Sequence, residues 1–192
     1  MKIVNPEKLL IQTVSILDQL KIDYFITGGL ARAVWGTPRS TSDIDIVIKI
    51  LESQVILLAK ALRKISKLGY IDEDTAREAI RSKGEFNFID PDSGLKVDFW
   101  VAKNNEKSIS EFNRRILKNV ESVKIYFISP EDLILNKLEW YKQGGLHVQL
   151  EDVGSVLKSS GKILDMTYLK KQAVKIGVSD ALEELSVHMH KN

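Results

Sequence analysis

Two aspartates, Asp43 and Asp45, are separated by a single residue at the start of an apolar stretch. This stretch is rich in isoleucine and valine, and it predicts a β-strand over residues 43–49. Side chains i and i+2 of a strand point to the same face, so the two carboxylates are expected to project side by side. Two like charges that close repel each other unless a cation lies between them, and Mg²⁺ is usually held by one or two carboxylates together with substrate phosphates. The pair therefore predicts a metal site for phosphoryl or nucleotidyl chemistry.

The alternative interpretation of the pair is a solvated edge strand with alternating charge. The strand is strongly apolar, however, which favours a central position, where carboxylates are costly unless they are paired or bind a metal. A third carboxylate, Asp98, lies between Val97 and Phe99 in another apolar stretch. It either caps a neighbouring loop or completes a carboxylate trio with Asp43 and Asp45, if the two strands pair.

Gly28 and Gly29 lie between a predicted strand and a predicted helix. Glycines at that place let the backbone approach a phosphate, and the start of the helix supplies free N–H groups. The simpler interpretation is a tight turn between strand and helix. Arg39 and Thr41, just before the first aspartate, offer a cation and a hydroxyl suited to a phosphate site, although a polar turn would have the same composition.

The composition limits the class of protein. The chain has 192 residues, of which 44% are hydrophobic and 28% charged, as in a globular protein. A net charge of +2 argues against non-specific nucleic-acid binding over the whole surface, and the absence of cysteine excludes disulfides, thiolate zinc sites and cysteine nucleophiles. No apolar run approaches the length of a membrane span, and Glu7 and Lys8 interrupt any signal-peptide core, so we expect a cytoplasmic protein without a membrane partner.

Apolar periodicity and turn signals predict an α/β fold followed by helices alone. The turn signal from Pro91 to Gly94 predicts a hairpin, and Ser129 followed by Pro130 predicts the start of a long helix. We expect helices over residues 5–20, 30–35, 52–68, 72–80, 108–117, 130–142, 147–159, 166–176 and 180–189, and strands over 24–27, 43–49, 85–89, 95–101 and 124–128.

The change of pattern near Ser129 predicts two regions: an α/β core over residues 1–128, and a C-terminal helical region over residues 129–192 that packs on the core. Lys137 lies among apolar residues on the first helix of this region, and Asp152 lies on the next helix. A lysine at an apolar position can also extend its ammonium group to solvent, so these two residues alone do not define a site.

The combination of these motifs resembles the nucleotidyltransferase superfamily that includes DNA polymerase beta. The pattern of that superfamily is a Gly-Gly or Gly-Ser pair after a strand, an Asp-x-Asp pair after a spacer, and a third acid on a later strand. Gly28 and Gly29, Asp43 and Asp45, and Asp98 match it. The segment from residue 28 to residue 45 looks closest to a small prokaryotic branch that includes the AbiEii-like toxin nucleotidyltransferases.

The resemblance continues into the helical region and covers roughly residues 24–160. The helix around Lys137 is similar to one that carries a lysine in that branch, and the segment ending at Asp152 is similar to the following helix. Gln149 stands where the toxins often have an acidic residue. This departure leaves the subfamily and the substrate open.

The resemblance implies a mixed β-sheet flanked by helices, with a C-terminal helical extension. It also implies that Asp43, Asp45 and Asp98 bind two Mg²⁺ or Mn²⁺ ions, and that Asp98 assists deprotonation of the acceptor hydroxyl. Gly28 and Gly29 would orient the phosphates of a nucleoside triphosphate (NTP) such as ATP. A set of further residues would complete the nucleotide site: Lys137 to neutralise the triphosphate, Asp152 to orient Lys137, and Arg39 and Thr41 as weaker phosphate contacts.

Three functions remain open at this point. The first is transfer of a nucleoside monophosphate (NMP) from an NTP to a hydroxyl on RNA (tRNA) or protein, with the chain as the toxin of a toxin–antitoxin pair and an antitoxin protein as partner. The second is a non-catalytic nucleotide-binding or partner-binding module that retains the fold. The third is modification of a small molecule such as an aminoglycoside, whose acceptor pocket would use acidic residues: Glu131, Asp132, Glu139 and Glu151.

Overall fold

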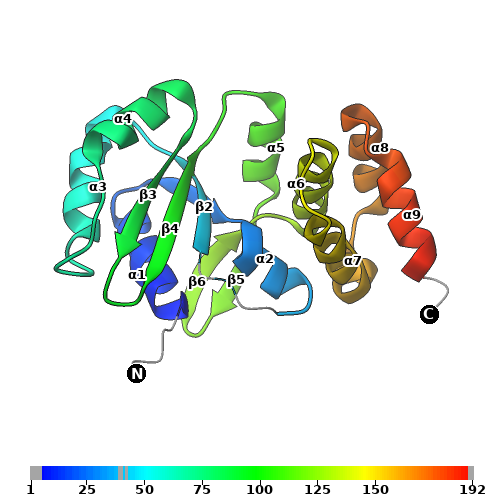
Figure 1. The fold of residues 1–192 in the computed structure, drawn as a ribbon, viewed down its shortest axis with the longest axis horizontal. Coiled ribbons are helices and arrows are strands. Elements are labelled where there is room, and N and C mark those ends of the chain that lie inside the picture. The colour runs from blue at the N-terminus through cyan, green and yellow to red at the C-terminus, as the bar shows by residue number, and fades with distance from the viewer. Residues whose placement is uncertain (1–5, 39–40, 42, 190–192) are drawn as a thin grey trace. The chain divides into compact units, whose positions relative to one another are not determined.

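The computed structural model describes residues 6–38, 41 and 43–189. The described residues form a six-stranded mixed sheet in the order β3-β4-β2-β1-β6-β5, with flanking helices and a C-terminal helical region (Figure 1). The predicted α/β class is therefore confirmed. The chain divides into two compact units: residues 1–30 with 40–127, and residues 31–39 with 128–192.

The first unit contains the sheet, in which β2 is a central strand. It pairs antiparallel with β1 and parallel with β4. Alternate residues of β2 are fully buried, which gives the strand one apolar face and one partly exposed face. The central position expected from the apolar sequence is confirmed. The strands are β1 (Asp23–Ile26), β2 (Asp43–Lys49), β3 (Glu85–Asp90), β4 (Leu95–Val101), β5 (Ile116–Val120) and β6 (Val123–Phe127).

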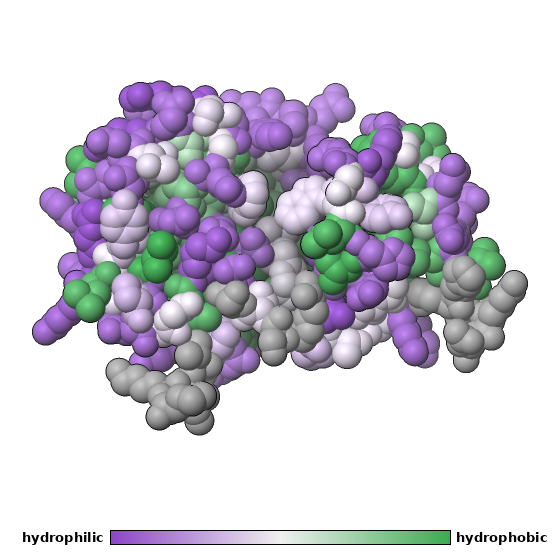
Figure 2. All heavy atoms as spheres, viewed as in Figure 1, coloured by the Kyte–Doolittle hydropathy of each residue, from purple (hydrophilic) through white to green (hydrophobic). Residues whose placement is uncertain are grey.

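The helices of the first unit bury apolar stripes. Leu9, Leu10, Val14 and Leu17 of α1 lie at helical spacing and are buried. Side-chain caps begin two other helices: Asp72 accepts the Thr75 N–H at α4, and Asn105 caps α5. The helices are α1 (Pro6–Gln19), the short 3₁₀ turn η1 (Glu52–Gln54), α3 (Val55–Leu62), α4 (Glu73–Ser82) and α5 (Glu106–Arg114). The outer surface in view is mainly hydrophilic, with small groups of exposed hydrophobic residues (Figure 2).

The second unit is helical. Helix α2 (Gly28–Trp35) begins in the first unit and ends in this one. Its last residue, Trp35, is held at both backbone and ring: Ser160 Oγ donates to the Trp35 carbonyl at 2.6 Å, and Trp35 Nε1 donates to the Ile128 carbonyl at 2.8 Å. The other elements are α6 (Pro130–Lys142), α7 (Val148–Ser160), the 3₁₀ turn η2 (Gly161–Ile163), α8 (Met166–Ile176) and α9 (Ser179–Met189).

Two expected helices were too long. The predicted helix over residues 52–68 ends at Leu62, because the chain must turn back so that Tyr70 can pair with Ile89 beside β3. The predicted helix over residues 108–117 ends at Arg114, and residues 116–120 form β5, a strand that the sequence did not predict. Tertiary pairing with β6 overrides the local helical pattern there. None of the helices among the described residues is long and apolar enough to cross a lipid bilayer.

Candidate functional site

The register of the sheet brings the predicted carboxylates together. Asp45 on β2 lies directly opposite Asp98 on β4, and Asp43 lies opposite Lys96. Asp98 in turn lies opposite Asn87 on β3. Because residues opposite each other or two apart share a face, these side chains form one polar surface on three adjacent strands.

Asp45 lies between the other two carboxylates and is partly buried. Burial is the main cause that raises the pKa of its carboxyl, and the negative charges of Asp98 and Asp43 raise it further. The Trp100 side chain and the Gly29 backbone N–H donate hydrogen bonds to Asp45 and act in the opposite direction. A carboxylate in this position gains from any cation that reaches it.

Lys96 supplies a cation within the polar surface. Its Nζ lies 2.9 Å from Asp98 Oδ2. The hydrogen bond to Asp98 is the main cause that raises the pKa of the Lys96 ammonium, and the charges of Asp43 and Asp45 also contribute. The three acids therefore act together on one positive group, which is the electrostatic property that a metal site requires.

The two glycines allow close contacts around these acids. Gly28 has a φ of +60°, and a Cβ added there would lie 1.9 Å from Asp45 Oδ2. A Cβ on Gly29 would lie 2.8 Å from Thr41 Oγ1, and Thr41 Oγ1 itself donates to the Asp43 carbonyl at 3.1 Å. Only glycine lets the first turn of α2 approach the aspartate strand this closely. Arg39, the weaker phosphate contact predicted above, lies outside the described residues.

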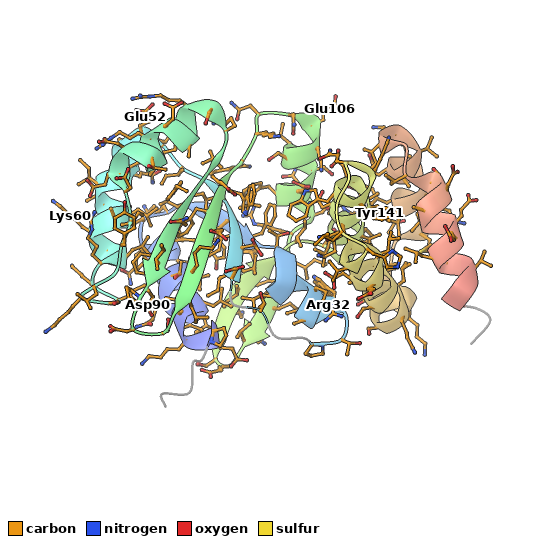
Figure 3. All side chains as sticks on the ribbon, viewed as in Figure 1. Arg32, Glu52, Lys60, Asp90, Glu106 and Tyr141 are labelled. Atoms are coloured by element: carbon orange, nitrogen blue, oxygen red, sulfur yellow. The ribbon has the colours of Figure 1, made fainter. Side chains whose placement is uncertain are left out.

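A second cluster of charges lies inside the helical unit. Asp152 is 1% exposed, and its two oxygens lie 2.7 Å from Lys137 Nζ and 3.0 Å from Arg32 Nε. Lys137 also donates to Gln149 Oε1 at 3.1 Å, and Arg32 Nη1 donates to the Thr37 carbonyl. Arg32 projects from α2 (Figure 3). Two buried cations share one buried carboxylate, so the three side chains carry a formal charge of +1.

The predicted site residues thus fall into two groups. Asp43, Asp45 and Asp98 belong to the first unit and Lys137 and Asp152 to the second. Within each unit the structure brings the predicted residues into contact or into register. Asp152 Oδ2 lies 2.7 Å from Lys137 Nζ, which is the contact that the predicted orienting role requires, and the role itself stays a prediction.

The acidic surface suits metal ions that also bind substrate. Among the described residues, no three acids or histidines converge closely enough to enclose an ion by themselves. An open Mg²⁺ site needs only one or two carboxylates, because phosphate oxygens and water complete the coordination. Asp43, Asp45 and Asp98 are oxygen donors on one face and fit this requirement.

Solved structures of nucleotidyltransferases are similar to this one. The crystal structure of ANT(2")-Ia in complex with adenylyl-2"-tobramycin has a TM-score of 0.62 and 14% sequence identity, covering 88% of this chain and 95% of that chain. The solution structure of ANT(2")-Ia has a TM-score of 0.57 and 13% identity, covering 97% of both chains. The lincosamide antibiotic adenylyltransferase LnuA with lincomycin bound has a TM-score of 0.55 and 17% identity, covering 80% of this chain and 97% of that chain. The chain has the nucleotidyltransferase fold.

The sequence of this nucleotidyltransferase-fold protein shows no comparable similarity. It matches no protein-family model, and a search of curated proteins finds no significant match. The fold is therefore established by the structure, whereas the branch resembling AbiEii-like toxins stays a prediction.

Three residues that contact the predicted site residues were not predicted from the sequence: Arg32, Lys96 and Trp100. A signal was available for two of them. Lys96 stands two residues before Asp98 on the same strand and so shares its face, and Arg32 is one helical turn beyond Gly28 in an otherwise apolar helix. For Trp100, nothing distinguished the indole from an ordinary apolar strand residue.

Two of the four acidic residues considered for a small-molecule pocket, Glu131 and Asp132, already make hydrogen bonds within the helical unit. Asp132 accepts hydrogen bonds from Ser129 Oγ at 2.8 Å and Tyr168 OH at 2.7 Å, and Glu131 accepts the Asp165 N–H at 2.7 Å. Both are buried and fix the start of α6.

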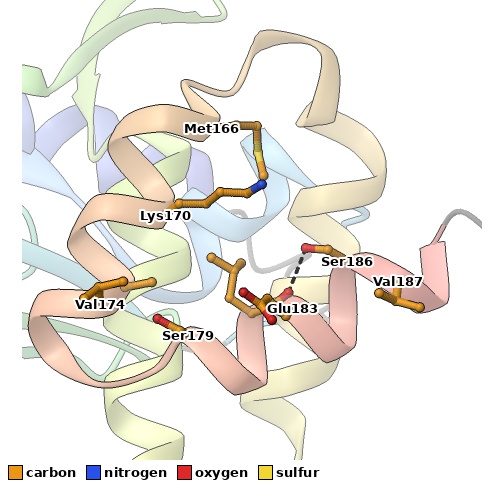
Figure 4. A pocket seen from close by; sticks show the side chains of 9 residues that line it. Met166, Lys170, Val174, Ser179, Glu183, Ser186 and Val187 are labelled. Atoms are coloured by element: carbon orange, nitrogen blue, oxygen red, sulfur yellow. Dashed lines mark hydrogen bonds between the residues drawn. The ribbon is translucent and has the colours of Figure 1, made fainter.

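A groove of about 410 Å³ lies between α8 and α9 in the helical unit (Figure 4). Its walls are mostly apolar, with Lys170 and Glu183 among them, and Ser186 Oγ donates to the Leu182 carbonyl. None of the predicted site residues lines it.

Proposed function

We propose that this protein transfers an NMP from a metal-bound NTP to an acceptor hydroxyl and releases pyrophosphate. The observation that carries the proposal is the register that sets Asp45 beside Asp98, with Asp43 two residues along the same strand face. The nucleotidyltransferase fold supports this reading, although a fold alone does not assign a function.

The residues of the first unit take distinct roles in this mechanism. Asp43 and Asp45 hold the metal ions that carry the triphosphate, and backbone N–H groups near Gly28 and Gly29 orient the phosphates. Asp98 takes the proton of the attacking hydroxyl. The metal chemistry supplied at these residues, with two Mg²⁺ or Mn²⁺ ions bound, would be neutralisation of the negative charge that develops during the in-line displacement.

Lys137 and Asp152 are proposed to serve the same nucleotide. Lys137, with a net positive charge in its buried cluster, neutralises the triphosphate, and Asp152 fixes the position of the ammonium. Thr41, and Arg39 outside the described residues, remain proposed phosphate contacts.

The acceptor is proposed to carry a hydroxyl, and two classes remain. RNA (tRNA) or protein is the class inferred from the sequence, together with a cytoplasmic toxin role and an antitoxin partner, which stay predictions. A small molecule is the second class. It is supported by the similar structures, whose names include lincomycin and adenylyl-2"-tobramycin.

The test is incubation of the purified protein with each α-labelled NTP, Mg²⁺ or Mn²⁺, and a mixture of tRNA, cell extract and small hydroxyl compounds. We expect transfer of label, and a loss of at least about a hundredfold in Asp98→Asn, the typical contribution of a positioned general base. Asp74→Asn, on the outer face of α4, is the matched control and should keep full activity.

Binding is measured in parallel through thermal stability. An NTP with Mg²⁺ at about 100 times its Kd stabilises the folded state by about 2.7 kcal/mol. This shift should be lost in Asp43→Asn/Asp45→Asn. Binding without transfer to any acceptor would favour the non-catalytic module, and a wild-type protein that shows neither would refute the site.

A further inference from the structure

A small polar pocket lies beside Asp98, on the side away from Asp45. It has a volume of about 170 Å³ and is lined by Tyr70, Asp72, Thr75, Glu85, Phe86, Asn87 and Asp98. These residues come from the edge strand β3, the neighbouring strand β4, the start of α4 and the segment before it. The pocket lies wholly within the first unit.

The order of the polar side chains across the sheet indicates which reactant this pocket binds. Asp45, Asp98 and Asn87 are direct neighbours on three adjacent strands, so the row runs from the glycine turn to the pocket. Neighbouring strands are about 4.8 Å apart, so the row is roughly 10 Å long. If the triphosphate lies at the Gly28 end, an in-line displacement requires the attacking hydroxyl to come from the opposite end, where the pocket opens.

Polar groups of the pocket wall are free to bind a ligand. Within the part of the chain that the structure describes, the side chains of Tyr70, Glu85 and Asn87 make no hydrogen bond or ion pair. The Asn87 amide offers two N–H donors and a carbonyl oxygen acceptor. The exposed Tyr70 ring adds an apolar face that can pack against a sugar or a cation.

The charge of the pocket wall determines whether a cationic or an anionic acceptor is attracted. Asp72, Glu85 and Asp98 are carboxylates, and no lysine or arginine of the described residues lines the pocket. Accepting the Thr75 N–H holds the pKa of Asp72 below its usual range, so Asp72 is ionised at neutral pH. Lys96 pairs with Asp98, whereas Asp72 and Glu85 have no basic partner in the pocket wall, so the wall is net negative. A phosphate-bearing acceptor such as an RNA end is repelled here, whereas an amine is attracted.

We propose that this pocket is the acceptor site and that it takes a hydroxyl group carried by a small, positively charged amine. The inference rests on the proposed function. The acceptor oxygen bonds to the α-phosphorus, the bond from that phosphorus to the α–β bridging oxygen breaks, and pyrophosphate leaves with that oxygen. The proton of the hydroxyl passes to Asp98, while Asp72 and Glu85 bind the ammonium group.

The test uses three sugars that differ in charge: glucosamine, glucose and glucose 6-phosphate. Binding to the full chain is followed by the amide NMR signals of Thr75, Glu85 and Asn87, without NTP, so the result does not depend on catalysis. We expect glucosamine to shift these signals at lower concentration than glucose, and glucose 6-phosphate to have no effect. Equal binding of all three sugars, or no shift with glucosamine, would overturn the proposal.

Variants separate the pocket from the metal site. Asp72→Asn keeps the helix cap, because asparagine also caps helices, and Glu85→Gln is an exposed substitution. Each should weaken glucosamine binding by roughly two- to fivefold, the range for a partly exposed ion pair, while leaving glucose binding unchanged. The exposed α4 variant Glu78→Gln, outside the pocket, is the control. The NTP- and Mg²⁺-dependent thermal shift should be unaffected in all three variants.

Measurements of label transfer distinguish the proposed function from the proposed acceptor pocket. If the protein transfers label, the KM for a cationic acceptor should rise in Glu85→Gln while kcat stays within about twofold, as expected for loss of ground-state binding alone. Transfer to RNA that is indifferent to Asp72→Asn and Glu85→Gln would refute this pocket and retain the proposed function. Absence of transfer together with selective glucosamine binding would refute the proposed function and the acceptor role, and would retain only the amine-binding pocket.

Discussion

Only glycine fits the structure at position 28, for two separate reasons. Its backbone has a φ of +60°, which costs a residue with a side chain about 1–2 kcal/mol. The space where a Cβ would lie is also taken by the Asp45 carboxylate. The positive φ affects stability, whereas the missing Cβ affects the position of a proposed metal ligand. Substitutions can therefore separate the two effects.

The substitutions Gly28→Ala and Gly94→Ala make this separation. Gly94 has a similar φ of +71°, but nothing lies within 4 Å of its missing Cβ. We expect both variants to lose about 1–2 kcal/mol of unfolding free energy in urea titrations. Only Gly28→Ala should lose nucleotidyl transfer, on the order of a hundredfold, because Asp45 must move to make room. A fully active Gly28→Ala would show that Asp45 need not occupy this position.

The sequence predicted the acidic residues of the site but not the groups that surround them. Asp43, Asp45 and Asp98 were visible because carboxylates are rare in apolar strands. Their relative position was conditional on strand pairing, which depends on contacts distant in sequence. The hydrogen bond from Trp100 to Asp45 depends on the same pairing, since Trp100 lies on β4 and Asp45 on β2, and no local pattern indicates it.

At the scale of elements, one carboxylate connects three helices of the second unit. Asp152 on α7 pairs with Lys137 on α6 and with Arg32 on α2. All three side chains are buried. Removing the anion would leave two buried cations with no counter-charge, whereas removing Arg32 would leave a neutral pair. The energetic cost of these changes should therefore be strongly unequal.

This asymmetry is tested with Asp152→Asn and Arg32→Met. We expect Asp152→Asn to cost about 3–5 kcal/mol of unfolding free energy, because it leaves buried charge uncompensated. Arg32→Met should cost no more than about 2 kcal/mol, since Lys137 still pairs with Asp152. Both values come from chemical denaturation at neutral pH. Equal losses would mean that the two ion pairs do not share charge as the geometry indicates.

The helices and strands also show where prediction from the local sequence fails. Strand β2 was predicted with the observed bounds because its apolar character is intrinsic to residues 43–49. Strand β5 was missed because Leu117 and its neighbours become a strand only through pairing with β6. The helix expected to reach Leu68 ends at Leu62, where the chain turns back toward β3. In each failure a contact distant in sequence outweighs a local preference.

At the scale of the whole molecule, the fold shared with the similar structures covers more of the chain than the sequence motifs do. The sequence resemblance ended near residue 160, because α8 and α9 carry no residues with evident chemistry. The solution structure of ANT(2")-Ia nevertheless covers 97% of this chain. The C-terminal helices therefore belong to the compared fold, and they pack through buried Leu169 and Ala173 on α8 and Leu182 on α9.

The alkaline limit of stability should depend on one buried hydroxyl in the first unit. Tyr24 is 2% exposed, and burial is the main cause that raises the pKa of its hydroxyl well above its usual range, with the charge of Asp18 adding to the effect. The unfolded chain releases this proton at about pH 10. Below that pH the hydroxyl is neutral in both states, and its contribution to stability is fully present. As the pH rises further, the unfolded state loses the proton first and is favoured.

Tyr24→Phe removes this linkage without changing the shape of the buried ring. We expect the variant and the wild type to have similar unfolding free energies between pH 7 and 9, measured by urea titration. Above pH 10 the wild type should become less stable than the variant by about 1.4 kcal/mol for each further pH unit, up to the folded-state pKa. Taking the difference at each pH cancels the titration of every other group. A constant difference across this range would show that Tyr24 ionises as readily in the folded protein as in the unfolded chain, which its burial against Tyr126, with ring centroids 6.1 Å apart, argues against.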